Sequence, residues 1–290
     1  MFVNSIQFNM IIFLNNKYLP LEEANISPLD RGFLFADGVY EFLRTYNCKL
    51  FRFDDHYNRL KYSAEELGLA VPGKGNLKYI INELVTKNHF STKEYSVYIQ
   101  ITRGASFPRL HKFPVADCEQ TMLIWLSNIS SNGIENENGV KTILLKDLRW
   151  GRCDIKSISL LPNVMAKQKA VESNAVEAIL MREGYITEGS HTNVFSIKNS
   201  VVSTAPLSNF VLNGITRKVV IELCKNHELK ISERNILIDE ILGADEIFLT
   251  GTSTEIKPVV EVNGVEINKG LPGEITKIIQ HLFYDYVKEN

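Results

Sequence analysis

The stretch AVEAILMREGYITEGSHTNVFSIKNSVVST, residues 175–204, decides the fold class of this chain. Its two parts, 175–189 and 193–204, each read as a strand, a turn and a second strand, because runs of apolar and β-branched residues are interrupted by short polar segments. Elsewhere strands and helices both recur, but hairpin-like neighbours outnumber strand–helix–strand crossovers. This pattern favours a mixed α+β fold with two domains over a doubly wound parallel sheet.

The neighbouring segments supply further elements. The sequence MIIFLNNKYLP, residues 10–20, reads as a hairpin around Asn15 and Asn16. A helix at 54–67 has Asp54 and Asp55 as N-cap candidates and Gly68 as its expected end. The remaining helices are expected at 77–88, 162–173, 215–226 and 272–288, and the remaining strands at 38–53, 95–103, 121–127, 140–148 and 245–255.

A polar segment, SNGIENENG at residues 131–139, is the best candidate for a boundary between domains. The chain of 290 residues is long enough for two ordinary domains. We therefore expect a small N-terminal α/β domain at 1–130, a linker at 131–139 and a larger C-terminal domain at 140–290.

Composition argues against several classes of partner. The formal net charge is −2, and the absence of any block of five like charges predicts no nucleic-acid partner. The apolar runs are too short to span a membrane. The N-terminus lacks the basic region of a secretory signal, and Met10 is an alternative start. The four cysteines form no C-x-x-C pair, so we expect a reduced cytoplasmic enzyme.

Familiar catalytic motifs are missing from the sequence. It has no G-x-G-x-x-G after a strand, no P-loop, no H-E-x-x-H and no G-x-S-x-G, and its six histidines lack metal-ligand spacing. Two small-residue turns remain. Gly214 precedes an expected helix whose first amides, Ile215 and Thr216, could bind an anion, and Gly251 follows an apolar strand in TGTSTE.

Lys156 lies between apolar residues in CDIKSISLLPN, and it has two interpretations. It could extend to solvent along an apolar stem, or it could be a desolvated, nucleophilic amine. Together with the two anion-binding turns, such an amine indicates pyridoxal phosphate, which also requires a carboxylate for its pyridine nitrogen. Glu188, at the turn in YITEGSHTNVF, supplies that carboxylate.

The ordered set RCDIKS, LPNVMAKQKA, TEGSHTNVF, NGITR and DEIFLTGTSTEIKPV resembles the class IV (fold type IV) pyridoxal-phosphate aminotransferases. The resemblance extends from about residue 15 to about residue 267 and implies two domains with mixed sheets and the cofactor between them. The segments DRGFLFADGVYEFLRTYNCKLF and TRGASFPRLHKFP are similar to those of D-amino-acid transaminases.

The resemblance also implies a role for each matching residue. Lys156 matches the lysine that forms the Schiff base, and Glu188 matches the partner of the pyridine nitrogen. His191 departs from the serine run of the D-amino-acid enzymes. The other matches are to phosphate binding (Arg59, Thr192, Ile215, Thr216, Gly251 and Thr252) and to binding of the substrate carboxylate (Tyr40, Arg109 and His111).

The implied activity is transfer of an amino group from a D-amino acid, such as D-alanine, to a 2-oxo acid. The freed Lys156 would move the Cα proton, first as base and then as acid. The resemblance further implies a homodimer, in which the loop with Arg109 and His111 reaches the neighbouring subunit. Three alternatives remain open: a branched-chain L-amino-acid aminotransferase, an aminodeoxychorismate lyase and a non-catalytic pyridoxal-phosphate-binding protein.

Overall fold

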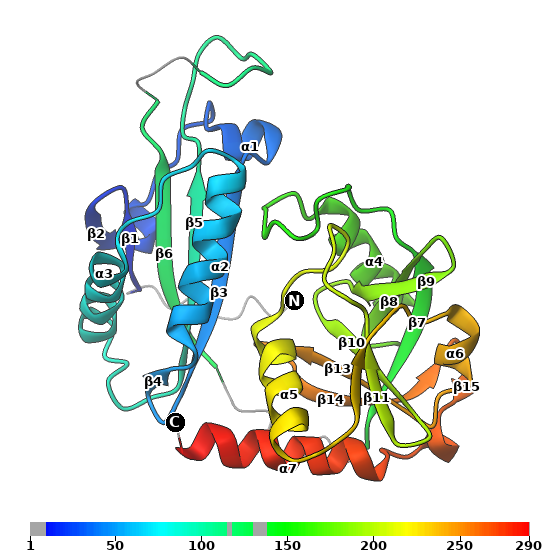
Figure 1. The fold of residues 1–290 in the computed structure, drawn as a ribbon. Helices are drawn as coiled ribbons and strands as arrows, with labels where there is room; N and C mark the ends of the chain where they lie inside the picture. The colour runs from blue at the N-terminus through cyan, green and yellow to red at the C-terminus, as the bar shows by residue number, and fades with distance from the viewer. Residues whose placement is uncertain (1–9, 115–117, 130–137, 290) are drawn as a thin grey trace. The chain divides into compact units, whose positions relative to one another are not determined.

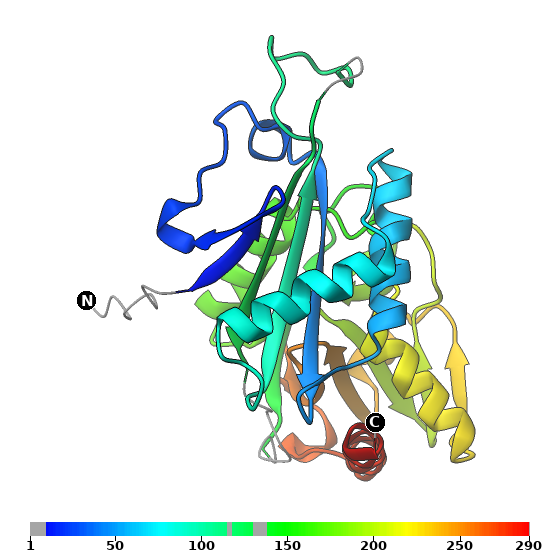
Figure 2. The ribbon, with the colours of Figure 1, turned by 90° about the vertical axis from the view of Figure 1, so that its left-hand side faces the viewer.

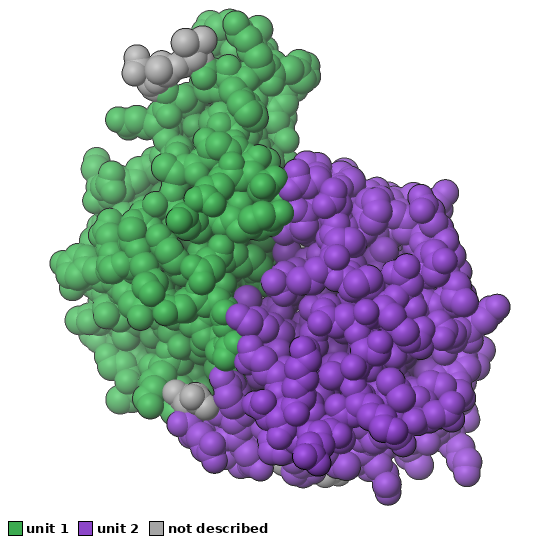
Figure 3. Space-filling model, in the orientation of Figure 1, with its two compact units in different colours: residues 1–130, 155–159 green, residues 131–154, 160–290 purple. Residues whose placement is uncertain are grey.

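The computed structural model describes residues 10–114, 118–129 and 138–289. The chain divides into two compact units, one of residues 1–130 with 155–159 and one of residues 131–154 with 160–290 (Figure 3). The expected linker at 131–139 lies largely outside the described residues. The short segment Ile155–Ser159 belongs to the N-terminal unit, a placement that a single division at 131–139 does not anticipate.

The N-terminal unit is built on a sheet with the strand order β2-β1-β6-β5-β3-β4 among the described residues (Figure 1). The neighbouring strands β3, β5 and β6 are antiparallel, with Tyr40 opposite Gln100 and Ile99 opposite Ile124. Two helices, α2 and α3, cover one face of this sheet (Figure 2). Leu60 of α2 and Ile81 of α3 are completely buried there. Successive side chains of a strand point to opposite faces of the sheet, so the apolar face of this sheet packs against the two helices.

The elements of this unit are β1 (Ile11–Leu14), β2 (Lys17–Pro20), the 3-10 turn η1 (Leu21–Glu23), α1 (Arg31–Phe35), β3 (Gly38–Tyr46), β4 (Lys49–Leu50), α2 (Phe53–Glu66), α3 (Lys74–Lys87), β5 (Tyr95–Thr102) and β6 (Thr121–Asn128). The expected hairpin around Asn15 and Asn16 is confirmed. The expected N-cap of α2 is wrong, because the helix begins at Phe53 and Arg52 occupies the cap. Asp55 instead accepts a hydrogen bond from Nε of Arg52, at 2.6 Å.

The C-terminal unit contains a mixed sheet with the order β12-β11-β10-β13-β14-β7-β8-β9 among the described strands, and β15 pairs with β14. The two expected hairpins are confirmed as the antiparallel pairs β8–β9 and β10–β11. Parallel pairs also occur, between β14 and β7, β7 and β8, and β11 and β12. The expected mixed α+β class is therefore confirmed, and antiparallel hairpins build most of the region around residues 177–204.

The elements of this unit are β7 (Val140–Lys146), α4 (Leu161–Glu172), β8 (Glu177–Arg182), β9 (Tyr185–Gly189), β10 (Asn193–Lys198), β11 (Val201–Thr204), α5 (Ile215–Asn226), β12 (Ile231–Glu233), α6 (Ile238–Leu242), β13 (Glu246–Gly251), β14 (Glu255–Val262), β15 (Val265–Glu266), the 3-10 turn η2 (Asn268–Gly270) and α7 (Glu274–Glu289). Helix α4 packs on β7 and β8, and helices α5 and α7 pack on each other and on β13. None of the helices in the described residues is both long and apolar enough to cross a membrane.

Candidate active-site residues

The backbone of Lys156 is fixed to the N-terminal unit. The amide of Tyr40 in β3 donates to the carbonyl oxygen of Lys156 at 3.0 Å, and the amide of Lys156 donates to Oγ of Ser63 in α2 at 3.0 Å. The preceding residue, Ile155, is buried in the core between the sheet and its helices. These contacts hold Lys156 at the edge of β3, where the chain adds a short extended segment to the sheet.

The side chain of Lys156 meets an aromatic surface. Its Nζ atom lies 4.1 Å from the centroid of the Tyr40 ring. That ring stacks on Tyr98, which in turn stacks on Trp125 at a centroid distance of 4.1 Å. Within the part of the chain that the structure describes, no carboxylate pairs with this amine. The structure thus brings Lys156 and Tyr40 together and leaves the amine available for covalent chemistry.

Arg59 on α2 is held by a buried carboxylate. Its Nε and Nη2 atoms donate to the two oxygens of Glu41 at 3.0 and 2.7 Å, and Nδ1 of His56 lies 3.0 Å from the same carboxylate. Burial alone would raise the pKa of Glu41, but the charges of Arg59 and His56 hold it well below its ordinary value. Arg59 is therefore a cation held in a fixed position by Glu41.

Arg109 and His111 lie on an exposed loop after β5. The guanidinium of Arg109 lies 4.1 Å from the centroid of the Phe35 ring, and the His111 ring lies 5.4 Å from the same ring. No described carboxylate forms an ion pair with Arg109. The structure brings these two residues together on Phe35, at the end of α1.

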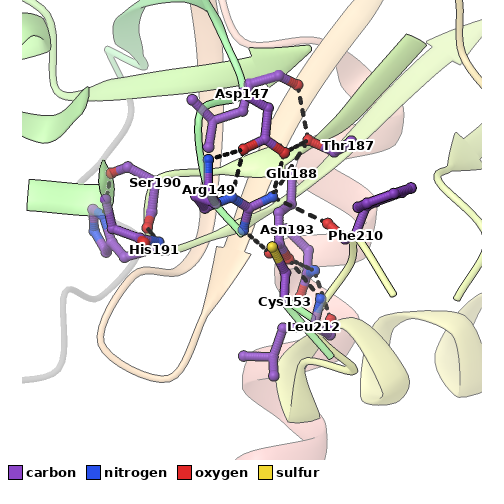
Figure 4. Close-up of polar contacts among 12 residues, drawn as sticks. Asp147, Arg149, Cys153, Thr187, Glu188, Ser190, His191, Asn193, Phe210 and Leu212 are labelled. Atoms are coloured by element: carbon purple, nitrogen blue, oxygen red, sulfur yellow. Dashed lines mark hydrogen bonds and ion pairs between the residues drawn. The ribbon is translucent and has the colours of Figure 1, made fainter. Parts of the chain in front are cut away.

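Glu188, in the C-terminal unit, is a buried carboxylate at the end of β9 (Figure 4). Its Oε1 atom pairs with the guanidinium of Arg149. Its Oε2 atom accepts hydrogen bonds from Nδ2 of Asn193 and from the amide of Leu212, each at 3.0 Å. Each carboxylate oxygen has two lone pairs, so these contacts orient the group without using its full capacity as an acceptor.

Arg149 links Glu188 to a second carboxylate. Its Nε and Nη2 atoms donate to Asp147 at 3.0 and 2.9 Å, and Nη2 also donates to the carbonyl oxygen of Phe210 at 3.0 Å. Burial raises the pKa of Glu188, whereas the charge and hydrogen bond of Arg149 oppose that rise. The arrangement keeps a carboxylate in a dry place with a cation beside it, which suits a group that holds a proton on a heterocyclic nitrogen.

The N-terminus of α5 presents the expected anion-binding amides. Ile215 and Thr216 are the first two residues of the helix, and Gly214 occupies the N-cap, where no described side chain forms a capping hydrogen bond. A Cβ atom on Gly214 would lie 2.0 Å from Oδ1 of Asn193, so this close approach requires glycine. Asn193 therefore touches both the helix N-terminus and Glu188.

Gly251 ends β13 at the same edge of the sheet as the start of β10, because Thr250 lies opposite Asn193. Thr252 follows in a half-buried turn. The structure therefore gathers Gly251, Thr252, Asn193 and the start of α5 around one corner of the C-terminal unit.

Thr192 and His191 lie next to this corner but are engaged elsewhere. The Thr192 hydroxyl donates to Oε2 of Glu177 at 3.0 Å, and Nδ1 of His191 lies 2.8 Å from the same oxygen. Ser190 contributes its hydroxyl to the other oxygen of Glu177. Burial alone would raise the pKa of Glu177, but its contacts with His191, Ser190 and the amide of Ala178 lower it. Thr192 therefore has a protein partner where the resemblance implies a phosphate.

Comparison with known proteins settles the family. The sequence pattern of the family described as amino-transferase class IV matches residues 38–262. The chain belongs to the class IV aminotransferases. This chain is 40% identical to a D-alanine aminotransferase from Staphylococcus aureus (strain N315). The match extends over 286 residues and covers 96% of this chain and 98% of that protein. A D-alanine aminotransferase from Bacillus licheniformis is 41% identical over 272 residues, which cover 93% and 95% of the two chains.

Solved structures of other class IV enzymes have the same fold. A branched-chain amino acid aminotransferase from Escherichia coli matches with a TM-score of 0.86 and 25% identity, covering 95% of this chain and 93% of that one. A branched-chain aminotransferase from Thermoproteus uzoniensis matches with a TM-score of 0.84 and 27% identity, covering 96% and 94%. The expected two-domain fold type IV architecture is confirmed.

The residues of this class IV enzyme fit the cofactor of its family, pyridoxal 5′-phosphate. The N-terminal unit offers an amine without an anionic partner among the described residues, and the C-terminal unit offers a buried carboxylate and an uncapped helix N-terminus. Sequence reasoning missed Arg149, Asn193, Glu41 and Glu177. The only local signals were the D-x-R spacing of Asp147 and Arg149 and the position of Asn193 within TEGSHTNVF.

Proposed function

We propose that this class IV aminotransferase acts on D-amino acids and passes the amino group to a 2-oxo acid. The observation that carries the proposal is the identity of about 40% to D-alanine aminotransferases from two bacterial genera over nearly the whole of both chains. The branched-chain aminotransferases from Escherichia coli and Thermoproteus uzoniensis, which have the same fold, are 25% and 27% identical. The substrate class therefore follows the closer sequence similarity.

Lys156 and Glu188 are assigned to the two ends of one cofactor ring. The amine of Lys156 attaches the cofactor covalently and later moves the proton at the substrate Cα. Glu188 holds a proton at the pyridine nitrogen, and Arg149 and Asn193 orient it. Pyridoxal phosphate supplies, when bound, the electron sink for the Cα–H electrons and the temporary store of the amino group.

The phosphate is assigned to two sets of groups. Arg59 supplies a cation held in place by Glu41, and the amides of Ile215 and Thr216 supply an uncapped helix N-terminus. Gly251 and Thr252 complete the set from the end of β13. Thr192 joins it only when its hydroxyl turns from Glu177 to the phosphate.

The substrate carboxylate is assigned to Arg109 and His111, with Tyr40 beside the reacting carbon. Arg109 is a guanidinium without a carboxylate partner among the described residues, and such a group forms strong paired hydrogen bonds to a carboxylate. Holding the carboxylate on one side decides which face of Cα is presented to Lys156. The side on which it is held is the physical basis for selecting one enantiomer.

The experiment compares D-alanine with L-leucine as amino donors in single half-reactions. Each half-reaction is monitored through the absorption of the bound cofactor. We expect D-alanine to react and Lys156→Ala to abolish the reaction. Borohydride should attach the cofactor to the wild type at Lys156 and leave Lys156→Ala unlabelled. A clear preference for L-leucine would favour the branched-chain alternative, and a protein that binds no pyridoxal phosphate would refute the assignment of the site.

We propose that the chain forms a homodimer in the cytoplasm. Phe33 and Phe107 expose 78% and 81% of their surface, and an apolar hollow of about 410 Å³ in the same unit is lined by Phe33 and Leu123, among others. Large exposed apolar patches commonly bind another protein surface. Light scattering should give twice the monomer mass, and a monomer would contradict the proposal.

The proposed compartment rests on the cysteines. All four are free thiols, as expected in a reducing compartment. Cell fractionation tests the compartment.

A further inference from the structure

The loop that carries Arg109 and His111 is tied to a buried ion network in the N-terminal unit. At the network's centre, Asp37 accepts hydrogen bonds from Nε of Arg31 and from Nε of Arg103, each at 2.8 Å. Both arginines are at least 90% buried. Nη2 of Arg103 also reaches Oδ1 of Asp37 at 3.0 Å. The network is thus a rigid base from which an exposed loop extends.

Arg31 reaches from this base to the loop backbone beside the proposed carboxylate ligands. Its Nη1 atom donates to the carbonyl oxygen of Leu110 at 2.7 Å, and its Nη2 atom to the carbonyl oxygen of His111 at 3.4 Å. Leu110 lies between Arg109 and His111 in the sequence. One planar guanidinium therefore contacts the backbone at the point from which both side chains start.

The same arginine also sets the position of the Arg109 side chain through Phe35. The Phe35 ring lies 4.7 Å from the guanidinium of Arg31 and 4.1 Å from that of Arg109, and it also contacts the His111 ring. Guanidinium groups stack favourably on aromatic rings. At the far end of the loop, Arg103 stacks on Phe113 at 3.7 Å.

We propose that Arg31 is a positioning residue for recognition of the substrate carboxylate, acting through the Leu110–His111 backbone and through Phe35. This inference rests on the proposed role of Arg109 and His111. Arg31 is buried and directs all three of its donor nitrogens to Asp37 and to this backbone. Its effect on the substrate therefore comes from the geometry that it imposes on the two ligands.

The test uses Arg31→Lys in the holoenzyme, with Arg52→Lys as the matched control. Lysine keeps the charge but replaces the planar fork by a single ammonium, so it cannot reach Asp37 and both carbonyl oxygens together. Arg52 also donates to an aspartate in the same unit, and that aspartate, Asp55, lies on α2. Both variants lose an arginine, and only one loses the loop anchor.

The measurement is the ratio of kcat/KM for D-alanine to kcat/KM for D-alaninamide, which lacks the carboxylate. We expect Arg31→Lys to lower this ratio at least about tenfold, mainly by raising the KM for D-alanine. A tenfold loss corresponds to about one hydrogen bond to a charged group. Arg52→Lys should leave the ratio unchanged. A purely structural defect would lower the two rates together and keep the ratio constant.

Two further variants separate the possible outcomes. Phe35→Leu removes the ring beneath Arg109, leaves Arg31 in place and should also lower the ratio; it decides the question if Arg31→Lys does not fold. Arg109→Met tests the proposed carboxylate ligand itself. If Arg109→Met lowers the ratio while Arg31→Lys and Phe35→Leu do not, the inference is wrong and the proposed function stands. If Arg109→Met leaves the ratio unchanged, the carboxylate assignment fails and the inference fails with it.

Discussion

The buried pair of Arg149 and Glu188 makes the sharpest prediction for the C-terminal unit. Arg149→Met keeps a long apolar side chain but removes the cation that pairs with Glu188 and with Asp147. All three side chains are almost completely buried. The substitution therefore leaves two carboxylates in a dry environment without their shared partner.

The size of the effect follows from that burial. Removing one member of a buried ion pair costs about 3–5 kcal/mol, because the remaining charge is uncompensated. Protonation of Glu188 relieves part of this cost, since its pKa is already raised by burial and rises further without Arg149. We expect a loss of about 3 kcal/mol in the free energy of unfolding. A protonated Glu188 can no longer hold the pyridine nitrogen as a cation, so the half-reaction with D-alanine should slow at least about tenfold.

The assay combines urea unfolding of the holoenzyme at neutral pH with single-turnover kinetics. Arg152→Met is the matched control, because Arg152 pairs with Asp154 at 2.9 Å and the two side chains are 36% and 14% exposed. This pair is half-buried, more exposed than Arg149 and Glu188, so its loss should cost less than that of a fully buried pair. The cofactor's absorption should shift only in Arg149→Met. Equal losses of stability and rate in the two variants would refute the argument that Arg149 keeps Glu188 ionised.

Two further predictions concern the same unit. Gly214→Ala should weaken retention of pyridoxal phosphate at least about tenfold, because its Cβ would lie 2.0 Å from Oδ1 of Asn193. Gly73→Ala is the control: this glycine occupies another helix N-cap, its Cβ would meet nothing within 4 Å, and the change should have little effect. Equal retention of the cofactor by the two variants in equilibrium dialysis would contradict the prediction. The pKa of Glu177 is lowered in the folded state, so its ionised form stabilises the fold above the ordinary glutamate pKa, and this contribution is lost as the pH falls through the lowered value. Glu177→Gln should therefore flatten the decline of the unfolding free energy below about pH 4.5, and an unchanged slope in urea titrations would count against it.

Local pattern was sufficient for most of the fold. The helix expected at 215–226 is α5 with the same bounds, because a strong apolar stripe and a preceding glycine mark it. The helix expected at 272–288 is α7 at Glu274–Glu289. The five-residue helix α1 was not predicted, since one turn and a half is too short to show a period. The start of α2 was misplaced because two aspartates resemble a cap whether or not they form one.

The candidate site was harder, because its contacts join distant residues. Lys156 is anchored by Ser63, 93 positions earlier, and Arg149 pairs with Glu188, 39 positions later. No local periodicity reports such pairs. Apolar context and the small-residue turns made Lys156 and Glu188 candidates, and the family resemblance then gave each of them a role. The supporting side chains Glu41, Glu177 and Arg149 depend on the fold that buries them, and a charged residue in a sequence is by default expected at the surface.

The placement of Ile155–Ser159 in the N-terminal unit has a consequence for biosynthesis and for dissection of the protein. On the ribosome, this unit cannot be completed until Ser159 has emerged, by which time β7 of the other unit has already been synthesised. A fragment that stops near residue 130 lacks Lys156 and leaves the edge of β3 beside Tyr40 without its partner. Separating the two units therefore requires a rearranged chain order, with residues 155–159 supplied to the N-terminal piece through a new connection.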